Sequence, residues 1–226
     1  TNERNVLKFM HETWDGKTLD IMCHVPRILD SFRIKEGSVH RPTIVMPYVD
    51  GVTLEDVEQR YSFTLKYIDP RDLAWMINRM LGALLAAHQA GYVHCGVLPP
   101  HIYLHPKDHG GQLLDWSYAV KPGQMVKAIA PRWRSFYPPE LINPDKAKRL
   151  PADFGTDLYM LAKCVWFVTD AGARLPRPYA GLFRACLLGP KHRPTNVFEF
   201  FKEFQDVLSG LYGPKKFRVF ELPNKP

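Results

Sequence analysis

The chain has 226 residues, of which 46% are hydrophobic, and this is enough to bury a sizeable core in one domain or two lobes. It contains no run of roughly 18 apolar residues, which argues against a transmembrane helix. Its four cysteines lack any Cys-x-x-Cys spacing, which indicates free thiols in a reducing, cytoplasmic or otherwise intracellular setting. The net charge of +7 suits nucleic acid, anionic lipid or an acidic protein as partner, and equally an ordinary soluble basic domain. Because the sequence starts at Thr1 without a signal-like segment, we expect a processed or trimmed product.

Residues 1–48 have the pattern of a small, strand-rich segment. A strand is predicted over residues 5–9 (NVLKF), where polar and apolar residues alternate, and another over residues 43–46 (TIVM). The intervening residues 13–18 (TWDGKT) interrupt any long helix, because glycine and threonine both have low helix propensity.

A long helix is predicted next. Asp69 is a suitable N-cap, Pro70 fits the first helical position, and Gly91 is a C-terminal signal. Between them, apolar residues recur with a period of 3.6: Leu73, Met76, Ile77, Met80, Leu81 and Leu84. This helix should be the central one, and it should deliver the stretch that follows.

The stretch over residues 91–117 reads GYVHCGVLPPHIYLHPKDHGGQLLDWS. Two short apolar runs, residues 102–104 and 112–114, are separated by a Gly-Gly turn, which predicts two short strands. His94 precedes the first strand and Asp115 follows the second. The layout resembles the catalytic and metal-binding loops of protein kinases, whose signatures are H-R-D-L-x-x-x-N and D-F-G.

The resemblance extends to the frame of these loops and not to their chemistry. His94 matches, but Gly96 stands at the position of the catalytic base. Leu98 replaces the lysine that neutralises the transferred phosphoryl group, and His101 replaces the metal-binding asparagine. Of the charged set, Asp115 survives. The resemblance therefore implies a pseudokinase, a kinase fold without its phosphoryl-transfer groups and without a catalytic residue.

The same resemblance implies a nucleotide pocket, in which ATP and Mg²⁺ are the cofactors left open. Four residues would form it: Lys8, Met46, Val49 and Asp115. Lys8 takes the place of the V-A-I-K lysine, with Glu12 and Asp15 as its candidate partners; the alternative is a solvent-facing lysine on an edge strand. Only seven residues precede Lys8, so the glycine-rich hairpin of the family is either upstream of residue 1 or missing.

Three further landmarks support the resemblance. Residues 137–140 (YPPE) resemble the A-P-E closure and residues 192–195 (HRPT) the R-P-T junction, so Arg193 is expected to form a buried pair with Glu140. Asp157 is expected to lie at the start of a buried helix and to hold the backbone around His94. Residues 153–155 spell Asp-Phe-Gly, but they follow the closure motif, and we interpret the triplet as coincidence.

The resemblance covers about residues 5–208 and predicts an α+β, two-lobed protein kinase-like fold. The small, reduced β lobe would span residues 1–48 and the mainly helical large lobe residues 49–210. An irregular extension, residues 211–226, would follow. The last helix is expected to begin after Thr195 as its cap and to carry an apolar stripe: Val197, Phe198, Phe201, Phe204 and Leu208.

The expected function is that of a catalytically inactive kinase-like domain that binds or scaffolds a protein partner, within a larger assembly. The partner surface is expected on residues 121–134 or on the tail after Gly210. The first of these segments is basic through four residues: Lys121, Lys127, Arg132 and Arg134.

Three alternatives remain open at this point. The first is an unorthodox, low-activity ATP-dependent kinase that uses Lys8 and Asp115. The second is a nucleic-acid-binding module that uses residues 132–134 (RWR), the one place where basic and aromatic residues interleave. The third is a zinc site. Cysteine and histidine are suitable zinc ligands, although the spacing of the candidates matches no closed zinc site. The five candidate ligands are His94, Cys95, His101, His105 and His109. In the kinase-like interpretation, the last two histidines fall in a turn and are expected to be solvated.

Overall fold

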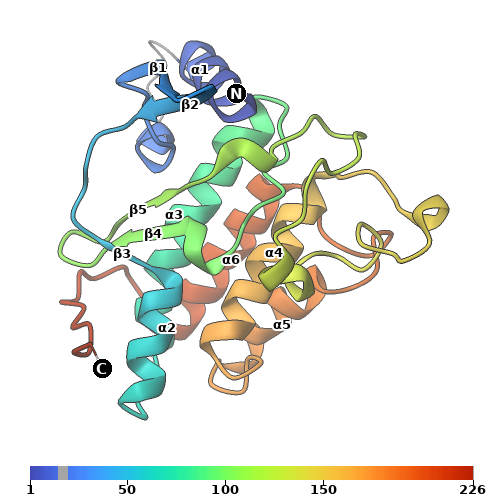
Figure 1. The fold of residues 1–226 in the computed structure, drawn as a ribbon. Coiled ribbons are helices and arrows are strands. Elements are labelled where there is room, and N and C mark those ends of the chain that lie inside the picture. Colours follow the sequence, from blue (N-terminus) through green and yellow to red (C-terminus); the bar gives the residue numbers. More distant parts are fainter. Residues whose placement is uncertain (15–19, 226) are drawn as a thin grey trace.

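The architecture of the computed structural model, which describes residues 1–14 and 20–225, is α+β (Figure 1). Helices dominate, and the strands form two small antiparallel sheets. Within the described ranges, no helix has the length and apolar character needed to cross a membrane.

Helix α1 (Asn2–Trp14) lies where the sequence predicts a strand, so that prediction is wrong. Val6, Leu7 and Met10 are all buried. Adjacent residues of a strand point to opposite faces, whereas positions i, i+1 and i+4 share one side of a helix. The five residues that alternate were too short a window to separate the two periods. Lys8 projects from the exposed side of α1, with its Nζ 3.7 Å from Glu12.

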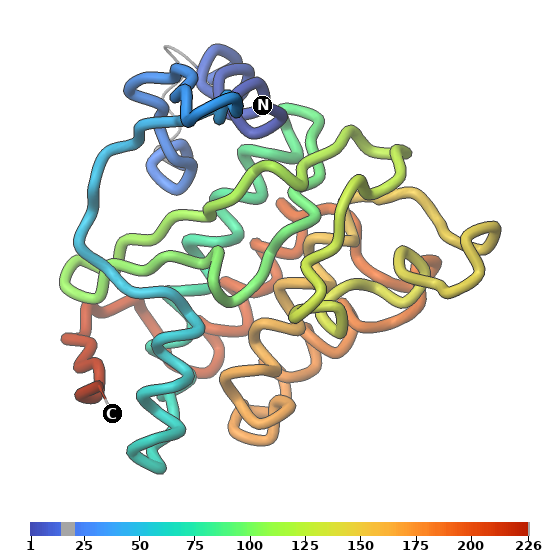
Figure 2. The backbone as a smooth tube through the Cα atoms, viewed as in Figure 1, coloured from blue at the N-terminus to red at the C-terminus, as the bar shows by residue number. Residues whose placement is uncertain are grey.

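Strands β1 (Asp30–Glu36) and β2 (Val39–Val45) form a two-stranded antiparallel hairpin. The second strand predicted in this segment is confirmed, and it ends at Val45. The hairpin leaves several apolar side chains exposed, among them Phe32 and Ile34. From it, an extended connection over residues 46–51 leads to the second sheet (Figure 2).

Helix α3 (Pro70–Gln89) is the central helix that the sequence predicts. The Asp69 side chain caps it by accepting a hydrogen bond from the backbone N–H of Arg71, and Pro70 stands at its first position. It contacts the 3₁₀ helix η1 (Asp20–His24) and strand β5 (Gly110–Leu113) as well as helices α4 (Phe154–Val168) and α6 (Val197–Tyr212). Contact on both sides explains why apolar residues occur all round this helix.

The second sheet has the order β3-β4-β5 and places the two ends of the predicted loop side by side. Strand β3 (Val52–Thr53) pairs with β4 (Ile102–His105), and β4 pairs with β5. The two short strands predicted from the sequence are therefore confirmed, but the Gly-Gly pair predicted as the turn between them is the start of β5, and the turn is formed by residues 106–109. Because Ile102 is opposite Leu113, the residues just before β4 and just after β5 emerge at the same edge.

The remaining helices pack on the second sheet and on α4 and α6. Helix α2 (Leu54–Phe63) follows β3, and α5 (Arg177–Cys186) packs against α4 and α6. Short 3₁₀ helices join them: η2 (Pro99–His101), η3 (Trp116–Tyr118), η4 (Pro131–Phe136) and η5 (Lys146–Lys148). The predicted stripe of α6 is only partly right: Val197 and Phe204 are buried, but Phe198 is exposed, and buried Phe200 was not among the predicted residues. Asn196, not Thr195, caps α6.

Candidate functional site

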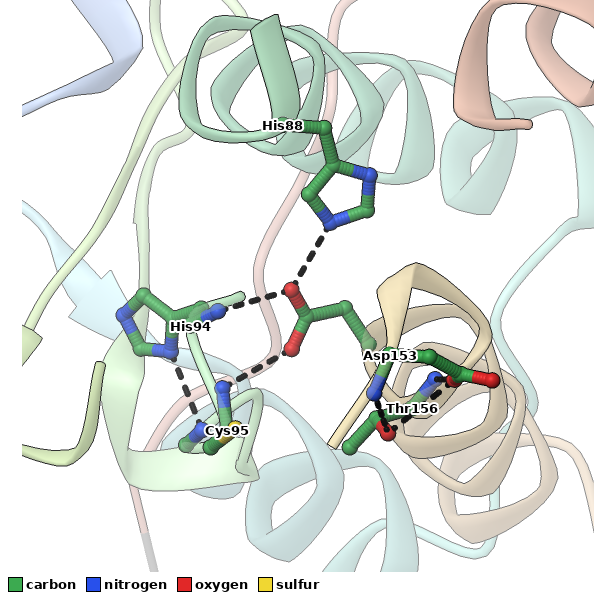
Figure 3. A network of polar contacts seen from close by, with 7 residues as sticks. His88, His94, Cys95, Asp153 and Thr156 are labelled. Carbon is green, nitrogen blue, oxygen red and sulfur yellow. Dashed lines mark hydrogen bonds and ion pairs between the residues drawn. The ribbon is translucent and has the colours of Figure 1, made fainter. Parts of the chain in front are cut away.

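The carboxylate of Asp157 anchors the loop that begins at His94 (Figure 3). Asp157 lies in the first turn of α4 and is fully buried. Its Oδ2 accepts a hydrogen bond from the backbone N–H of His94 at 2.8 Å and lies 2.9 Å from His88 Nε2. Its Oδ1 accepts one from the N–H of Cys95 at 2.9 Å. These bonds hold Cys95 in a left-handed backbone conformation, with φ of 57°.

Asp153 has a different role, as the N-cap of α4. Its side chain accepts a hydrogen bond from the N–H of Thr156, and the Thr156 hydroxyl accepts one from the Asp153 N–H. This reciprocal capping is a helix-start signal. The literal Asp-Phe-Gly triplet of residues 153–155 is therefore the start of a helix, while Asp157, four residues on, contacts the loop.

The ring of His94 is sealed inside the protein. It is fully buried, and it meets Trp116 edge to face at 4.5 Å. Its Nδ1 accepts a hydrogen bond from the N–H of Gly96 at 3.1 Å, which places the single proton of a neutral ring on Nε2. Burial lowers the pKa of His94 to about 4, against the opposing charge of Asp157.

We expect this histidine to make stability sensitive to acid. His94 takes up a proton near pH 6.5 in the unfolded chain but only near pH 4 in the folded one. Stability is therefore complete above pH 6.5 and falls as the pH drops toward 4, by about 3 kcal/mol in total. Urea unfolding at pH 7 and pH 5 should show a smaller difference for His94→Leu than for the wild type. His192→Leu, at an exposed histidine, is the control and should keep the wild-type difference; an unchanged pH dependence in His94→Leu would contradict the prediction.

The three replaced positions of the loop face inward. A side chain at Gly96 would put its Cβ 3.0 Å from the Tyr118 ring and 3.3 Å from the His94 ring. Leu98 is fully buried and belongs to the hydrophobic core. His101 has its Nδ1 2.8 Å from the carbonyl oxygen of Gly96, so its ring is fixed to the loop.

Asp115 lies at the edge where β4 begins and β5 ends, and it has polar neighbours from three elements. Its Oδ2 is 3.4 Å from His101 Nε2. Its Oδ1 caps η3, by accepting hydrogen bonds from the N–H and the hydroxyl of Ser117. From α1, Glu3 Oε1 accepts a bond from the N–H of Trp116 at 3.3 Å. Burial and the negative charge of the nearby Asp115 raise the pKa of Glu3.

Glu3 is the site residue that sequence reasoning missed. It stands three and four residues before Val6 and Leu7, on the side of α1 that packs inward. Asn2 extends the same attachment, since its side-chain amide donates to the carbonyls of Ser117 and Ala119 at 2.9 Å each. The signal was present in this 3.6-residue spacing but was hidden by the prediction of a strand.

None of the four residues proposed for a nucleotide pocket lines the open cavity beside α1 and η1. An open cavity of about 560 Å³ is lined by residues of α1, η1 and the connection to β3, including His11 and Pro47. Lys8, Met46, Val49 and Asp115 are not among its lining residues. Met46 packs against the core, and the carbonyl of Val49 accepts a hydrogen bond from the Tyr103 hydroxyl at 3.0 Å.

The assignment of Lys8 to that pocket is corrected, because it rested on a strand that is a helix. Lys8 forms an exposed i,i+4 ion pair with Glu12. This is the solvent-facing alternative, on a helix in place of an edge strand. The other candidate partner, Asp15, lies outside the described residues.

The histidines and the cysteine of the zinc alternative do not converge. In the part of the chain that the structure describes, no group of three His, Cys, Asp or Glu side chains is placed to hold a metal ion. The expectation that His105 and His109 are solvated is wrong, because both are buried. The Nδ1 of His105 is 3.0 Å from the carbonyl of Asp50, and His109 stacks on Trp75 at 4.5 Å.

The basic segment, residues 121–134, makes contacts within its own chain. Arg132 pairs with Glu55, and Arg134 donates to the carbonyl of Ile142 at 2.7 Å. Trp133 meets Phe136 and Phe167 edge to face, at 5.0 and 5.7 Å. The aromatic ring on which the nucleic-acid alternative depends is therefore half-buried against Phe136 and Phe167.

Glu140 and Arg193 form a buried ion pair at 2.7 Å. The Arg193 side chain is 2% exposed and that of Glu140 12%. Arg193 also donates to the Leu188 carbonyl from Nε and Nη2, at 3.2 and 2.8 Å, and its guanidinium lies 4.6 Å from the centre of the Tyr159 ring. The pair ties the segment after η4 to the loop between α5 and α6.

Comparison with known proteins gives weak similarity to protein kinases. No family model matches the chain. It is 29% identical over 161 residues to serine/threonine-protein kinase PknB of Mycolicibacterium smegmatis, which covers 71% of this chain and 25% of that protein. It is 24% identical over 179 residues to a probable serine/threonine-protein kinase of Corynebacterium efficiens, covering 78% and 26%. The chain thus spans about a quarter of the length of these curated relatives. The weak homology suggests a protein kinase-like relationship, with which the α+β fold is compatible.

Proposed function

We propose that the chain is a catalytically inactive protein kinase-like domain, a pseudokinase, that acts as a protein-binding or scaffold module in an intracellular assembly. In this proposal, residues 1–48 are a reduced small lobe and residues 49–210 a helical large lobe. The proposal rests on two features taken together: the loop is fixed by buried polar contacts, and it lacks the groups that phosphoryl transfer requires. Asp157 and the Glu140–Arg193 pair hold the loop and its surroundings, while the loop presents Gly96 where a base is required.

Phosphoryl transfer depends almost entirely on positioning and on stabilisation of charge. Gly96 has no side chain to accept a proton, and buried Leu98 brings no charge to the phosphoryl group. His101 offers an imidazole, whereas Mg²⁺ prefers oxygen ligands. Asp115 is the one carboxylate at a metal-binding position of the family, and its Oδ1 is already engaged by Ser117. This donor set does not fit a pair of magnesium ions.

A low-activity ATP-dependent kinase is the second candidate, since both relatives bear the names of kinases. In that case Asp115 would hold a metal, with Glu3 close by. Lys8 would have no part in it, because it points to solvent from α1.

Transfer of radiolabelled phosphate from ATP to generic protein substrates separates the two candidates. We expect no magnesium-dependent transfer by the wild type or by Gly96→Asp. One restored group leaves two others missing, each typically worth about 10²–10³ in rate, and the new side chain must displace Tyr118. The triple variant, which adds Leu98→Lys and His101→Asn to Gly96→Asp, tests whether the fold supports phosphoryl transfer once all three groups are restored. The proposal would be overturned if the wild type transferred phosphate in a magnesium-dependent way, if Asp115→Ala abolished this activity, and if the Asp153→Asn variant kept it.

We further propose that the partner is a protein with an acidic surface and that it contacts the basic segment, residues 121–134. The Arg132 side chain is 72% exposed despite its pairing, so it remains available at the rim of an interface. The test is co-purification of the assembly at low and high salt, with wild type and with Lys127→Glu/Arg134→Glu. The double variant should lose partners that the wild type holds at low salt; retention of every partner would place the surface elsewhere.

A further inference from the structure

The C-terminal tail, residues 213–225, returns to the body of the protein instead of extending away from it (Figure 1). Helix α6 ends at Tyr212, and Gly213 turns the chain with a φ of 71°. The tail then crosses to α2 and to the N-terminal half of α3, where Arg60 donates a hydrogen bond to the carbonyl of Pro223 at 3.2 Å. It reaches this place without forming a helix or a strand.

Two phenylalanines of the tail are seated on aromatic rings of the body. Phe220 is 7% exposed and lies next to Tyr61 of α2, at 6.4 Å, and to Trp75 of α3, at 5.7 Å. Phe217 stacks on His109 at 4.5 Å, and His109 stacks in turn on Trp75. Aromatic pairs in such geometries add to the stabilisation from buried area.

Arg218 stands between the two phenylalanines and meets an acidic pair at the start of α3. Its Nη1 is 3.1 Å from Asp69 Oδ2, and its Nη2 is 3.7 Å from Asp72 Oδ2. Val219 points outward and is 76% exposed. The tail thus presents an aromatic–Arg–x–aromatic pattern, of which three residues contact the body.

Side-chain contacts hold the tail on the body, and Phe220 joins the hydrophobic core there. Across the described residues, no backbone–backbone hydrogen bond joins residues 214–225 to another element. Two buried polar atoms of the surface under the tail have no hydrogen-bond partner within residues 1–14 and 20–225: Asp72 Oδ1 and Trp75 Nε1. Side-chain anchors seated on a surface are one of the ways in which peptides are recognised.

We propose that the surface formed by α2, α3 and the turn between β4 and β5 is a peptide-binding site, and that residues 217–223 are its resident, reversibly docked ligand. The ligand class is an extended peptide with the aromatic–Arg–x–aromatic pattern. Its arginine is recognised by Asp69 and Asp72, and its second aromatic residue by Tyr61 and Trp75. The site lies outside the Asp115 region and does not depend on the proposed pseudokinase function.

Attachment gives the resident tail an advantage over any free peptide. A short linker creates an effective concentration in the millimolar range, so a peptide of equal intrinsic affinity competes poorly with it. The linker residues 213–216 are exposed, and a protease site inserted between Pro214 and Lys215 would cut the full-length, folded chain without altering the surface under the tail.

The test measures binding of a fluorescent peptide with the sequence of residues 214–225 to the cut chain, by anisotropy. The released tail is first removed by gel filtration. The peptide should bind saturably, and at least about tenfold more tightly to the cut chain than to the uncut one. Peptides carrying Phe220→Ala or Arg218→Glu should bind about tenfold more weakly or worse, because each removes an anchor. Val219→Ala, at the neighbouring exposed residue, is the matched control and should bind within about twofold of the original.

Three outcomes would overturn the proposal. The cut chain could fail to bind the peptide, or Val219→Ala could weaken binding as much as Phe220→Ala does. The cut chain could also unfold once its tail is removed, which would make the tail part of the core. Because the substitutions are in the peptide, they cannot unfold the receptor.

Discussion

Asp157→Asn is expected to lower the free energy of unfolding by about 3–5 kcal/mol. Both carboxylate oxygens of Asp157 accept hydrogen bonds from backbone N–H groups, those of His94 and Cys95, and His88 approaches the same oxygen as His94. An amide has one oxygen, so one N–H group would face the NH₂ of the asparagine inside the protein. Domains of this kind are typically stable by about 5–15 kcal/mol, so the loss would be a large part of the total.

Asp153→Asn is the matched control, on the same helix and with the same chemical change. Asparagine caps helices as well as aspartate does, so we expect a loss within about 0.5 kcal/mol. Urea unfolding followed by circular dichroism gives both values from the midpoints, provided that the slope stays the same. Equal stability of the two variants would show that Asp157 is not the anchor of the loop.

The reason that the anchor matters is the conformation it imposes. Cys95 and Asp115 both have left-handed backbone angles, with φ of 57° and 58°. Such a conformation costs a residue with a side chain about 1–2 kcal/mol, which must be offset by contacts. At Cys95 the offset comes from Asp157, and at Asp115 from the capping of η3 and the contact with His101. These contacts together hold the loop in one conformation.

Features with strong local signals could be predicted from the sequence. Helix α3 combines an Asp cap, a proline at the first position and a sustained 3.6-residue period. Strands β4 and β5 contain the two short apolar runs, although the pair of glycines predicted as the turn between them belongs to β5. The Glu140–Arg193 contact joins residues 53 positions apart, and it was expected from the resemblance to protein kinases, not from a local signal.

Features that depend on distant partners could not be predicted. Helix α1 is marked by the adjacent buried pair Val6 and Leu7, which a five-residue alternation obscured, and the position of Glu3 was missed with it. His109 looks like a turn residue, and only the approach of Trp75 and Phe217 buries it. The docking of the tail likewise needs a surface assembled from three separate elements, so no local pattern announces it.

Arg193→Met is expected to destabilise the protein by about 3–5 kcal/mol. It leaves the Glu140 carboxylate, whose side chain is 12% exposed, without its partner, and it removes both donors to the Leu188 carbonyl. Glu140→Gln keeps an acceptor for the guanidinium and should cost less, about 1–2 kcal/mol. Arg184→Met, at an exposed arginine of α5, is the control and should change stability by no more than about 0.5 kcal/mol.

The double variant Arg193→Met/Glu140→Leu decides what kind of contact this is. Removing both charges leaves no buried carboxylate unpaired, so the double variant should be more stable than Arg193→Met alone. Urea unfolding of the wild type, Arg193→Met, Glu140→Leu and the double variant completes a cycle, in which we expect a coupling energy of about 1–3 kcal/mol. Two results would contradict this prediction: additive losses of stability in the cycle, or an Arg193→Met variant as stable as Arg184→Met. Either would mean that the ion pair contributes nothing specific and that the segment after η4 is held by its apolar contacts alone.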